Sequence, residues 1–284
     1  MMYAALILLF AFSQLAFPQS FTYKAINIPG ATETQVRGVN SSGEIVGFYK
    51  TTSCVETHIQ FPNCPVQGFK IVNGVITKLL VPHSTWTDIM GVNDYGDLVG
   101  FAMTTDTGAH GFLWKHQNTI TYFNTPEAGP NSDVHTVAMS VNKALVVDGA
   151  DWFFGNATPD GGWVWANGTF GRMNPGDSSG SCCPSGEGVN GISNNGFLSG
   201  QNFYQGHVTA WFKSAQDEDF YPLNNDVVGT AVNSNSDVIG FTVAGKGFSP
   251  SILNGTKATT TLRRSSQVSS RSTSPMPRPP TRLG

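Results

Sequence analysis

The chain has 284 residues, of which only 12% are charged, and it contains 32 glycines. Soluble domains usually carry about 25% charged residues, so this composition is typical of short strands joined by many tight turns. The residues before Lys257 carry 10 basic and 19 acidic side chains, and this acidic balance excludes the electrostatic footprint of a nucleic-acid-binding protein.

The N-terminus carries an apolar run over residues 4–17 that ends near small residues. This pattern is typical of a secretory signal peptide cleaved between Ala16 and Ser20, although Met1-Met2-Tyr3 lacks the usual basic residue. An uncleaved anchor is the alternative, but the run is shorter than the roughly 20 apolar residues of a membrane span. We predict a signal peptide over 1–20, a secreted location (extracellular or periplasmic) and no membrane contact after cleavage.

One motif returns five times along the chain, with starts 53, 49, 51 and 40 residues apart. The copies are GVNSSGEIVGF (38–48), GVNDYGDLVGF (91–101), SVNKALVVDGA (140–150), GISNNGFLSGQ (191–201) and AVNSNSDVIGF (231–241). Repetition at this period indicates one supersecondary unit copied into a stacked or closed array.

The third copy shows the unit most fully. GFLWK (111–115) leads through a polar turn to TITYFN (119–124), which alternates apolar and polar residues as a half-buried strand does. HTVAMSV (135–141) and LVVDGADWFF (145–154) follow. The unit therefore has four strands and no convincing helix, and its Asn-Gly pairs, such as Asn73-Gly74, predict hairpin turns.

The two ends of the repeat region complement each other. FTYKAINIPG (21–30) matches the second strand of the unit, whereas GFSPSIL (247–253) matches the first. We therefore predict an all-β, five-bladed β-propeller over 21–256, closed by a C-terminal strand that joins the N-terminal blade and leaves no free sheet edge. The expected blades are 21–50 with 247–253, then 68–103, 111–154, 162–204 and 207–243.

The segment 257–284 abandons the repeat and is rich in Ser, Thr, Pro and Arg. We expect a disordered tail, since it has little to bury. A basic arm that touches surface anions and a shifted reading frame are the alternatives. A shifted frame would weaken the argument for the closing strand.

The four cysteines suit an exported protein. Cys54 and Cys64 bracket one loop and are predicted to form a disulfide. Cys182 and Cys183 are neighbours, so a bond between them requires a strained peptide, and they are either free thiols or a vicinal bridge.

Several of these segments together resemble a known family, the HAF-type extracellular repeat of bacterial secreted proteins. The resemblance is carried by His110 to Trp114 (HGFLW), Ile26 to Ala31 (INIPGA) and the GVN motifs, and it covers roughly 21–256. It implies a secreted, propeller-shaped repeat protein and supplies no catalytic residue. Copy three lacks the turn glycine and copy four has Ser193 in place of Asn, so these two copies depart from the pattern.

Alternating strand directions predict one face with tight turns and one face that holds every long loop. Binding is expected on the long-loop face, because function concentrates in loops on a rigid scaffold. The loops before the GVN motifs each carry an acid, and these acids are Glu33, Asp88, Asp133, Glu187 and Asp226. Such a ring could hold sugar hydroxyls, a cation or a pair of glycosidase carboxylates. Alternatively, the acids only keep an exported protein soluble.

The candidate ligand-binding residues are the loop acids with nearby aromatic and histidine side chains, namely Trp86, Asp88, His110, Asp133, His135, Glu187 and Asp226. Trp86 is placed in a loop, where stacking on a sugar ring is plausible. No metal site is expected, because the histidines lack ligand spacing and the acids match no calcium loop. No cofactor is expected either, with calcium in the acidic ring as the one alternative. GDSSGS (176–181) has no paired His motif, so no catalytic residue is assigned.

The sequence therefore predicts a secreted, non-enzymatic, monomeric module that binds an extracellular polysaccharide or a surface protein. The alternatives are a carbohydrate-active hydrolase, with a carboxylate pair drawn from Asp88, Asp133, Glu187 and Asp226, and a purely structural envelope repeat protein.

Overall fold

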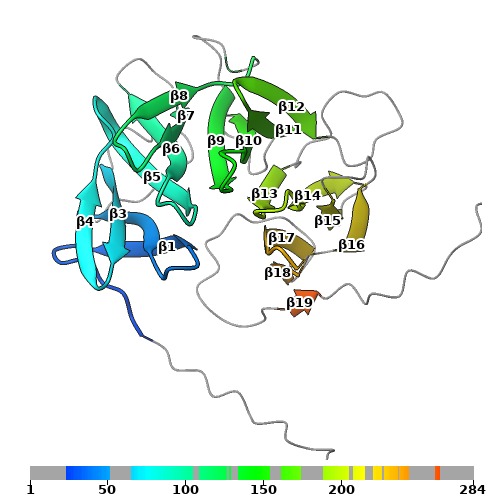
Figure 1. Ribbon diagram of the computed structural model, residues 1–284, viewed down its shortest axis with the longest axis horizontal. Helices are drawn as coiled ribbons and strands as arrows, with labels where there is room; N and C mark the ends of the chain where they lie inside the picture. Colours follow the sequence, from blue (N-terminus) through cyan, green and yellow to red (C-terminus); the bar gives the residue numbers. More distant parts are fainter. Residues whose placement is uncertain are drawn as a thin grey trace, which may run out of the picture.

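The structure is a computed structural model. It describes residues 24–51, 65–104, 109–126, 128, 134–153, 161–173, 188–204, 207–214, 220–225, 227–235, 237–242 and 260–262. All regular structure in these ranges is β-strand, which confirms the all-β class (Figure 1). In this part of the chain no helix is long and apolar enough to cross a membrane.

The described strands form sheets of eight, four, four and three strands around a common centre, in a propeller-like arrangement (Figure 1). We divide the eight-stranded sheet into two units, because only one parallel bridge joins its β3 and β5, and so describe five successive antiparallel units. Unit one holds β1 (Glu33–Val39), β2 (Ile45–Lys50), β3 (Val66–Val72) and β4 (Val75–Leu79). Unit two holds β5 (Ser84–Val92), β6 (Leu98–Thr104), β7 (Ala109–Trp114) and β8 (Ile120–Phe123). Unit three holds β9 (Val134–Val141), β10 (Val147–Phe153), β11 (Gly161–Ala166) and β12 (Thr169–Met173).

The last two units follow the same order. Unit four holds β13 (Gly188–Ile192), β14 (Leu198–Tyr204), β15 (His207–Lys213) and β16 (Tyr221–Asn225). Unit five holds β17 (Val227–Val232) and β18 (Val238–Thr242), and β19 (Thr260–Leu262) pairs with β18. β19 falls inside the predicted tail 257–284, and the rest of that tail and the predicted signal peptide lie outside the described residues.

The boundaries of the blades differ from those that the sequence predicted. The antiparallel pairings run from 33 to 79 and from 84 to 123, and only the parallel bridge between Val66 and Trp86 joins the two series, so each unit begins two strands later than expected. The long connection 51–65 suggested a crossing between blades, but it joins β2 to β3, which pair from Ile45↔Ile71 to Lys50↔Val66. Strand and turn signals repeat evenly, so they give the period of the array without telling which strand comes first.

This shift also corrects the predicted closure. Unit one has four strands of its own, so it does not lack the inner strand that we assigned to 247–253. Residues 247–253 themselves lie outside the described residues.

The first strand of each unit is the inner one, and each inner strand contacts the next around the centre, from β1 through β5, β9 and β13 to β17. Small residues make this approach possible. A Cβ added to Gly91 would lie 2.8 Å from the Met139 carbonyl oxygen, and one added to Gly191 would lie 2.8 Å from the Cα of Ala231. The glycine of the GVN motif is therefore a packing requirement of the inner ring.

The glycine of the second strand serves the sheet itself. In unit two, a Cβ on Gly100 would lie 2.0 Å from the Asp88 carbonyl oxygen, because each inner strand has a β-bulge at this point. In unit three, the Trp163 ring covers Gly149, with an atom 2.5 Å from the position of an added Cβ. Only glycine fits under these contacts.

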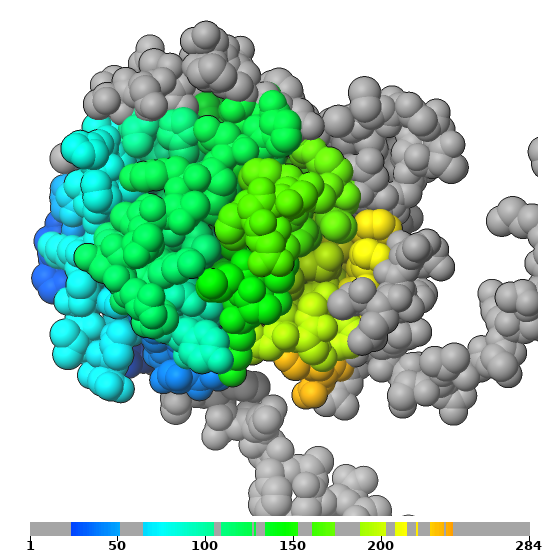
Figure 2. Space-filling view, turned by 45° about the horizontal axis from the view of Figure 1, so that its top comes forward, coloured from blue at the N-terminus to red at the C-terminus, as the bar shows by residue number. Residues whose placement is uncertain are grey.

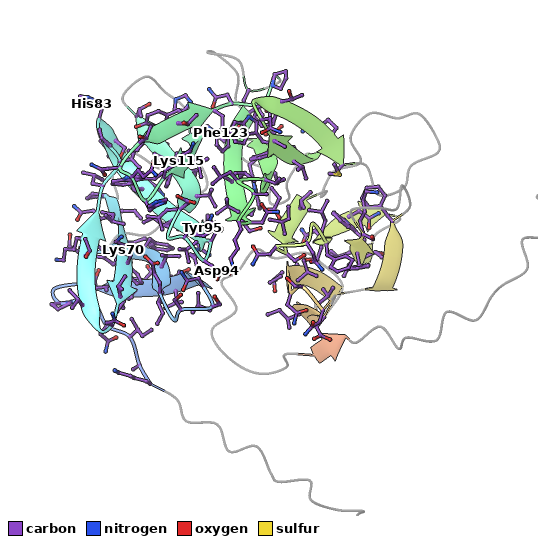
Figure 3. The ribbon with its side chains drawn as sticks, in the orientation of Figure 1. Lys70, His83, Asp94, Tyr95, Lys115 and Phe123 are labelled. Atoms are coloured by element: carbon purple, nitrogen blue, oxygen red, sulfur yellow. The ribbon has the colours of Figure 1, made fainter. Side chains whose placement is uncertain are left out.

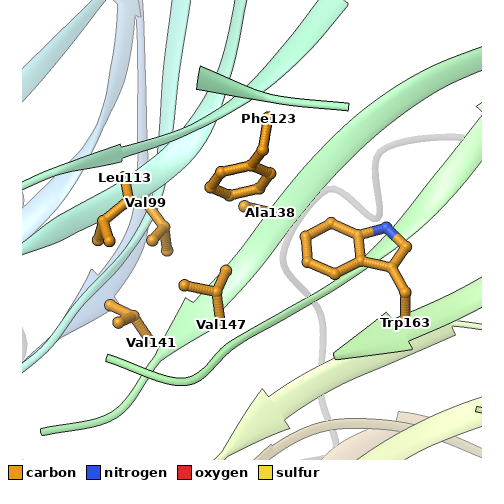
Figure 4. Close-up of a cluster of buried hydrophobic side chains, with 7 residues drawn as sticks. All are labelled: Val99, Leu113, Phe123, Ala138, Val141, Val147 and Trp163. Atoms are coloured by element: carbon orange, nitrogen blue, oxygen red, sulfur yellow. The ribbon is translucent and has the colours of Figure 1, made fainter. Parts of the chain in front are cut away.

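The hydrophobic core lies between units as well as within them. One cluster joins unit two to unit three and consists of Val99, Leu113, Phe123, Ala138, Val141, Val147 and Trp163 (Figure 4). The Phe123 and Trp163 rings meet edge to face at 5.7 Å. In the space-filling view the cyan and green units adjoin directly (Figure 2). Neighbouring units therefore share their apolar faces and stabilise one another.

Candidate functional site

The antiparallel strands give the array two different ends. The connections from first to second strand and from third to fourth strand lie at one end, which we call the turn end. The second-to-third connections and the crossings between units lie at the other, which we call the loop end. The longer connections 51–65, 124–133, 154–160 and 174–187 all leave strands at the loop end, as the sequence predicted.

The turn end is held by the asparagine of the repeat motif. Asn93 Oδ1 accepts hydrogen bonds from the backbone N–H groups of Tyr95 and Asp97, both at 2.9 Å. Its Nδ2 donates to the carbonyl oxygen of Asn142 in the next unit at 3.1 Å. Asn40 and Asn142 repeat this pattern toward their own next units. The motif asparagine is therefore a clasp between units, and no ligand is needed to explain it.

Asp94 joins four units at the turn end. Its carboxylate accepts from the backbone N–H of Ser41 at 2.9 Å, from Lys143 Nζ at 3.0 Å and from Asn194 Nδ2 at 3.2 Å. Asp94 lies toward the centre of the fan, by which we mean the five units arranged around their common centre (Figure 3). Hydrogen bonds from Ser41, together with Lys143, hold the pKa of Asp94 well below its usual range, against a smaller opposing effect of burial. These contacts use the turn end for structure.

At the loop end, equivalent positions carry different chemistry in each unit. Residues that pair across the first and second strands near their loop ends form the sets Glu33 and Lys50, Trp86 and Met103, and His135 and Trp152. In unit one, Lys50 Nζ lies 3.1 Å from Glu33 Oε2. Burial raises the pKa of Glu33, but hydrogen bonds from Gln35 and Lys50 outweigh it, so that pKa lies below the usual value.

Two buried carboxylates hold partly exposed guanidinium groups. Asp88 Oδ2 lies 3.0 Å from Arg37 Nη2, and Asp151 Oδ2 lies 2.8 Å from Arg172 Nη2. The arginine side chains are 34% and 32% exposed, whereas both aspartates are 3% exposed. Thr125 Oγ1 also donates to Asp151, at 2.9 Å. Each acid thus fixes the orientation of a planar donor group that reaches solvent.

Two buried polar atoms, one in β10 and one in β14, lack partners among the described residues. Trp152 Nε1 and Asn202 Oδ1 are buried atoms with no hydrogen-bond partner among the described residues. Asn202 holds the position in unit four that Asp151 holds in unit three, since each comes two residues after the second-strand glycine. One is a donor and the other an acceptor, and both are covered, so a ligand hydroxyl would pair with either atom only where binding displaces that cover.

The predicted site residues that the structure describes do not lie in loops. Trp86 lies in β5, is 4% exposed and packs against Phe48 and Val66 of unit one, so its placement in a loop is wrong. The physical reason is that β5 begins as early as Ser84 and that Trp86 covers the seam to unit one. Its role as a ligand contact stays a prediction.

Asp88 also lies inside β5, buried and paired with Arg37. His110 Nδ1 lies 2.9 Å from Asn124 Oδ1, and His135 Nδ1 accepts from the backbone N–H of Ala109 at 2.9 Å. Asp133, Glu187, Asp226 and the predicted Cys54–Cys64 disulfide lie outside the described residues. Within the described ranges, no group of three or more His, Cys, Asp or Glu could hold a metal ion.

Sequence reasoning missed Arg37, Asp151, Trp152 and Arg172. A signal existed for two of them, because VDGADWF departs from the VGF motif at Asp148 and Ala150, directly before Asp151 and Trp152. Arg37 had no sequence signal. It occupies the bulge between Val36 and Gly38, and a bulge re-aims its side chain in a way that alternation does not predict.

No protein-family model and no curated protein matches the chain, so the resemblance to the HAF-type repeat stays a prediction. Solved structures similar to it include a lectin from Aleuria aurantia, an N224Q mutant crystallised with a fucose-containing disaccharide, at 15% identity. That match covers 64% of this chain and 57% of the lectin, with a TM-score of 0.40.

Two further solved structures are similar at the same level. TolB from Acinetobacter baumannii matches at 10% identity over 75% of this chain and 53% of TolB, with a TM-score of 0.42. A triple mutant of AofleA from Arthrobotrys oligospora matches at 12% identity over 77% of this chain and 69% of AofleA, with a TM-score of 0.40. The chain thus spans a little over half of the Aleuria lectin and of TolB, and likeness at this level says nothing about its own ligand.

Proposed function

We propose that this protein is a secreted, non-enzymatic binding module whose loop end takes an extracellular carbohydrate. The observation that carries the proposal is the contrast between the two ends of one repeated unit. At the turn end units one to three keep the same asparagine clasp, whereas at the loop end the same strands carry an ion pair, a Trp–Met set and a His–Trp set. Positions that folding needs stay constant between copies, so the varied end is where recognition would reside.

The chemistry of the loop end favours a neutral, hydroxyl-rich ligand. Among the described residues of this end, Glu33 and Asp151 are each paired with a cation, so neither offers an unpaired charge to a metal ion or a polyanion. Fixed guanidinium groups and partnerless polar atoms of both kinds suit hydroxyls, which donate and accept together. Binding in this manner needs no nucleophile or acid–base pair.

The test is a polysaccharide and glycan array probed with the full secreted chain, followed by calorimetry on any saccharide that binds. Trp152→Phe removes the partnerless N–H and keeps the ring, and Arg172→Ala removes the held guanidinium. Both variants are expected to weaken binding at least about tenfold, the loss expected for a hydrogen bond to a polar ligand group.

The matched control is Tyr95→Ala, an exposed residue of the turn end, which should leave binding unchanged. Loss of binding in Tyr95→Ala with full binding in the other two variants would move the site to the turn end. Silence of the folded protein across the array would refute a carbohydrate ligand, and release of shortened saccharides would show a hydrolase instead.

A further inference from the structure

Units one and five each carry an uncovered apolar face at an end of the fan. Val36 of β1 is 49% exposed, although its counterparts Ile89, Ala138 and Val189 are fully buried. Ile239 of β18 is 42% exposed, although the residues at its position in the other four units are fully buried (Val46, Val99, Asp148 and Ser199). The exposure therefore belongs to the ends of the array and not to these positions in the repeat.

The register of the repeat shows what covers each face elsewhere. Val46 of unit one lies in one cluster with Ile89 of unit two, so the Val46 position faces the next unit and the Ile89 position faces the previous one. Ile239 corresponds to Val46, and Val36 corresponds to Ile89. The two exposed faces are thus the two halves of the contact that the chain already makes between consecutive units.

The turn end has an unfinished clasp at the same place. In units one to three the side-chain amide of the motif asparagine donates to the next unit. In unit four Asn195 Nδ2 donates instead, to the Ser234 carbonyl oxygen of unit five at 2.8 Å. Asn233 of unit five keeps the turn bonds of its counterparts, with Nδ2 on Asp237 at 3.1 Å. In the register of the series, the next acceptor is the carbonyl oxygen of Asn40 in unit one.

The centre of the fan is narrow. Units two and four are not consecutive, yet Asn194 Nδ2 of unit four lies 3.2 Å from Asp94 Oδ2 of unit two. If units two places apart are in contact, the centre of the ring is small, and such a ring contains few units. The occupant that fits the uncovered face of unit one is therefore unit five of the same chain.

We propose that the Val36 face of unit one and the Ile239 face of unit five form a fifth contact between units, which closes the array into a ring. In this contact Val36 packs on Ile239, Gly38 on Ala231, and Asn233 donates to the Asn40 carbonyl oxygen. The loop end then becomes a complete circle of five units.

The first test compares Val36→Asp with Val75→Asp, a residue that is 67% exposed on the outer strand β4. If the ring closes, a carboxylate at position 36 is buried, and the unfolding constant should rise at least about tenfold more than for Val75→Asp. Equal urea midpoints for the two variants would overturn the proposal.

The second test keeps the proposal falsifiable if Val36→Asp fails to fold. Val36→Cys with Ile239→Cys should oxidise to an intramolecular disulfide, detected as one linked peptide pair in the monomer by mass spectrometry. The matched control, Val75→Cys with Ile239→Cys, should give no such pair. A disulfide found only between two molecules, or no disulfide in the first pair, would show that the chain does not close on itself.

Discussion

The carboxyl group of Asp148 is expected to make the stability of this protein fall as the pH rises. Asp148 is fully buried in β10, at a position that is valine in units one and two. Its oxygens accept from the backbone N–H and the hydroxyl of Ser140, each at 2.8 Å, and that hydroxyl accepts from the N–H of Ile192 in unit four at 2.8 Å. Burial raises the pKa of Asp148 to about 8, and the Ser140 bonds offset only part of this effect.

The sign follows from proton linkage. The folded chain keeps a proton on Asp148 up to about pH 8, whereas the unfolded chain releases it near the ordinary value of 3.8. The contribution to stability is therefore fully present below the unfolded value and is lost as the pH rises toward the folded value. Each pH unit inside this window costs about 1.4 kcal/mol, so the free energy of unfolding should fall by about 3 kcal/mol between pH 5 and pH 7.

The variant that tests this is Asp148→Asn, which keeps the shape and both partners but cannot ionise. Urea unfolding of the two proteins at pH 5, 6 and 7 should give a slope in the wild type that the variant lacks. Histidine titration affects both proteins alike, so the difference between the curves reports Asp148 alone. Parallel curves, within about 0.5 kcal/mol at every pH, would refute a neutral buried carboxyl, since independent sites add to that accuracy.

Three further predictions concern the repeat. Asp148→Val alone should destabilise the protein by about 1–3 kcal/mol, because it leaves the Ser140 hydroxyl without its acceptor, and Ser140→Gly added to it should restore most of that loss in urea melts. Gly100→Ala should lower the free energy of unfolding by more than about 3 kcal/mol, because its Cβ meets a backbone oxygen at 2.0 Å. Gly171→Ala, whose Cβ has its nearest neighbour at 3.8 Å, should lower it by under about 1 kcal/mol. Similar melting temperatures for the two variants would contradict the close approach at Gly100. Ser193→Asn should raise the free energy of unfolding by about 1 kcal/mol in urea melts, because it supplies the clasp amide that unit four lacks. An unchanged free energy of unfolding would show that Asn195 already replaces that amide.

The sequence determined the kind of array but not its starting strand. Repeated GVN and VGF motifs, alternating strands and Asn-Gly turns give an all-β series of four-stranded units, because turn chemistry and side-chain alternation act over a few residues. Which strand begins a unit depends on hydrogen bonds across the connections 51–65 and 79–84, and connection length does not report them.

The same limit holds for the candidate site. Local patterns predicted that long loops gather at one end, since strand direction alternates. They placed Trp86 and Asp88 in loops, whereas packing at the seam between units and the Arg37 pair hold both in β5. Arg37 and Asp88 are 51 residues apart, and Asp151 and Arg172 are 21 apart. Pairing over such separations arises from the arrangement of the sheets, so only the tertiary structure could decide it.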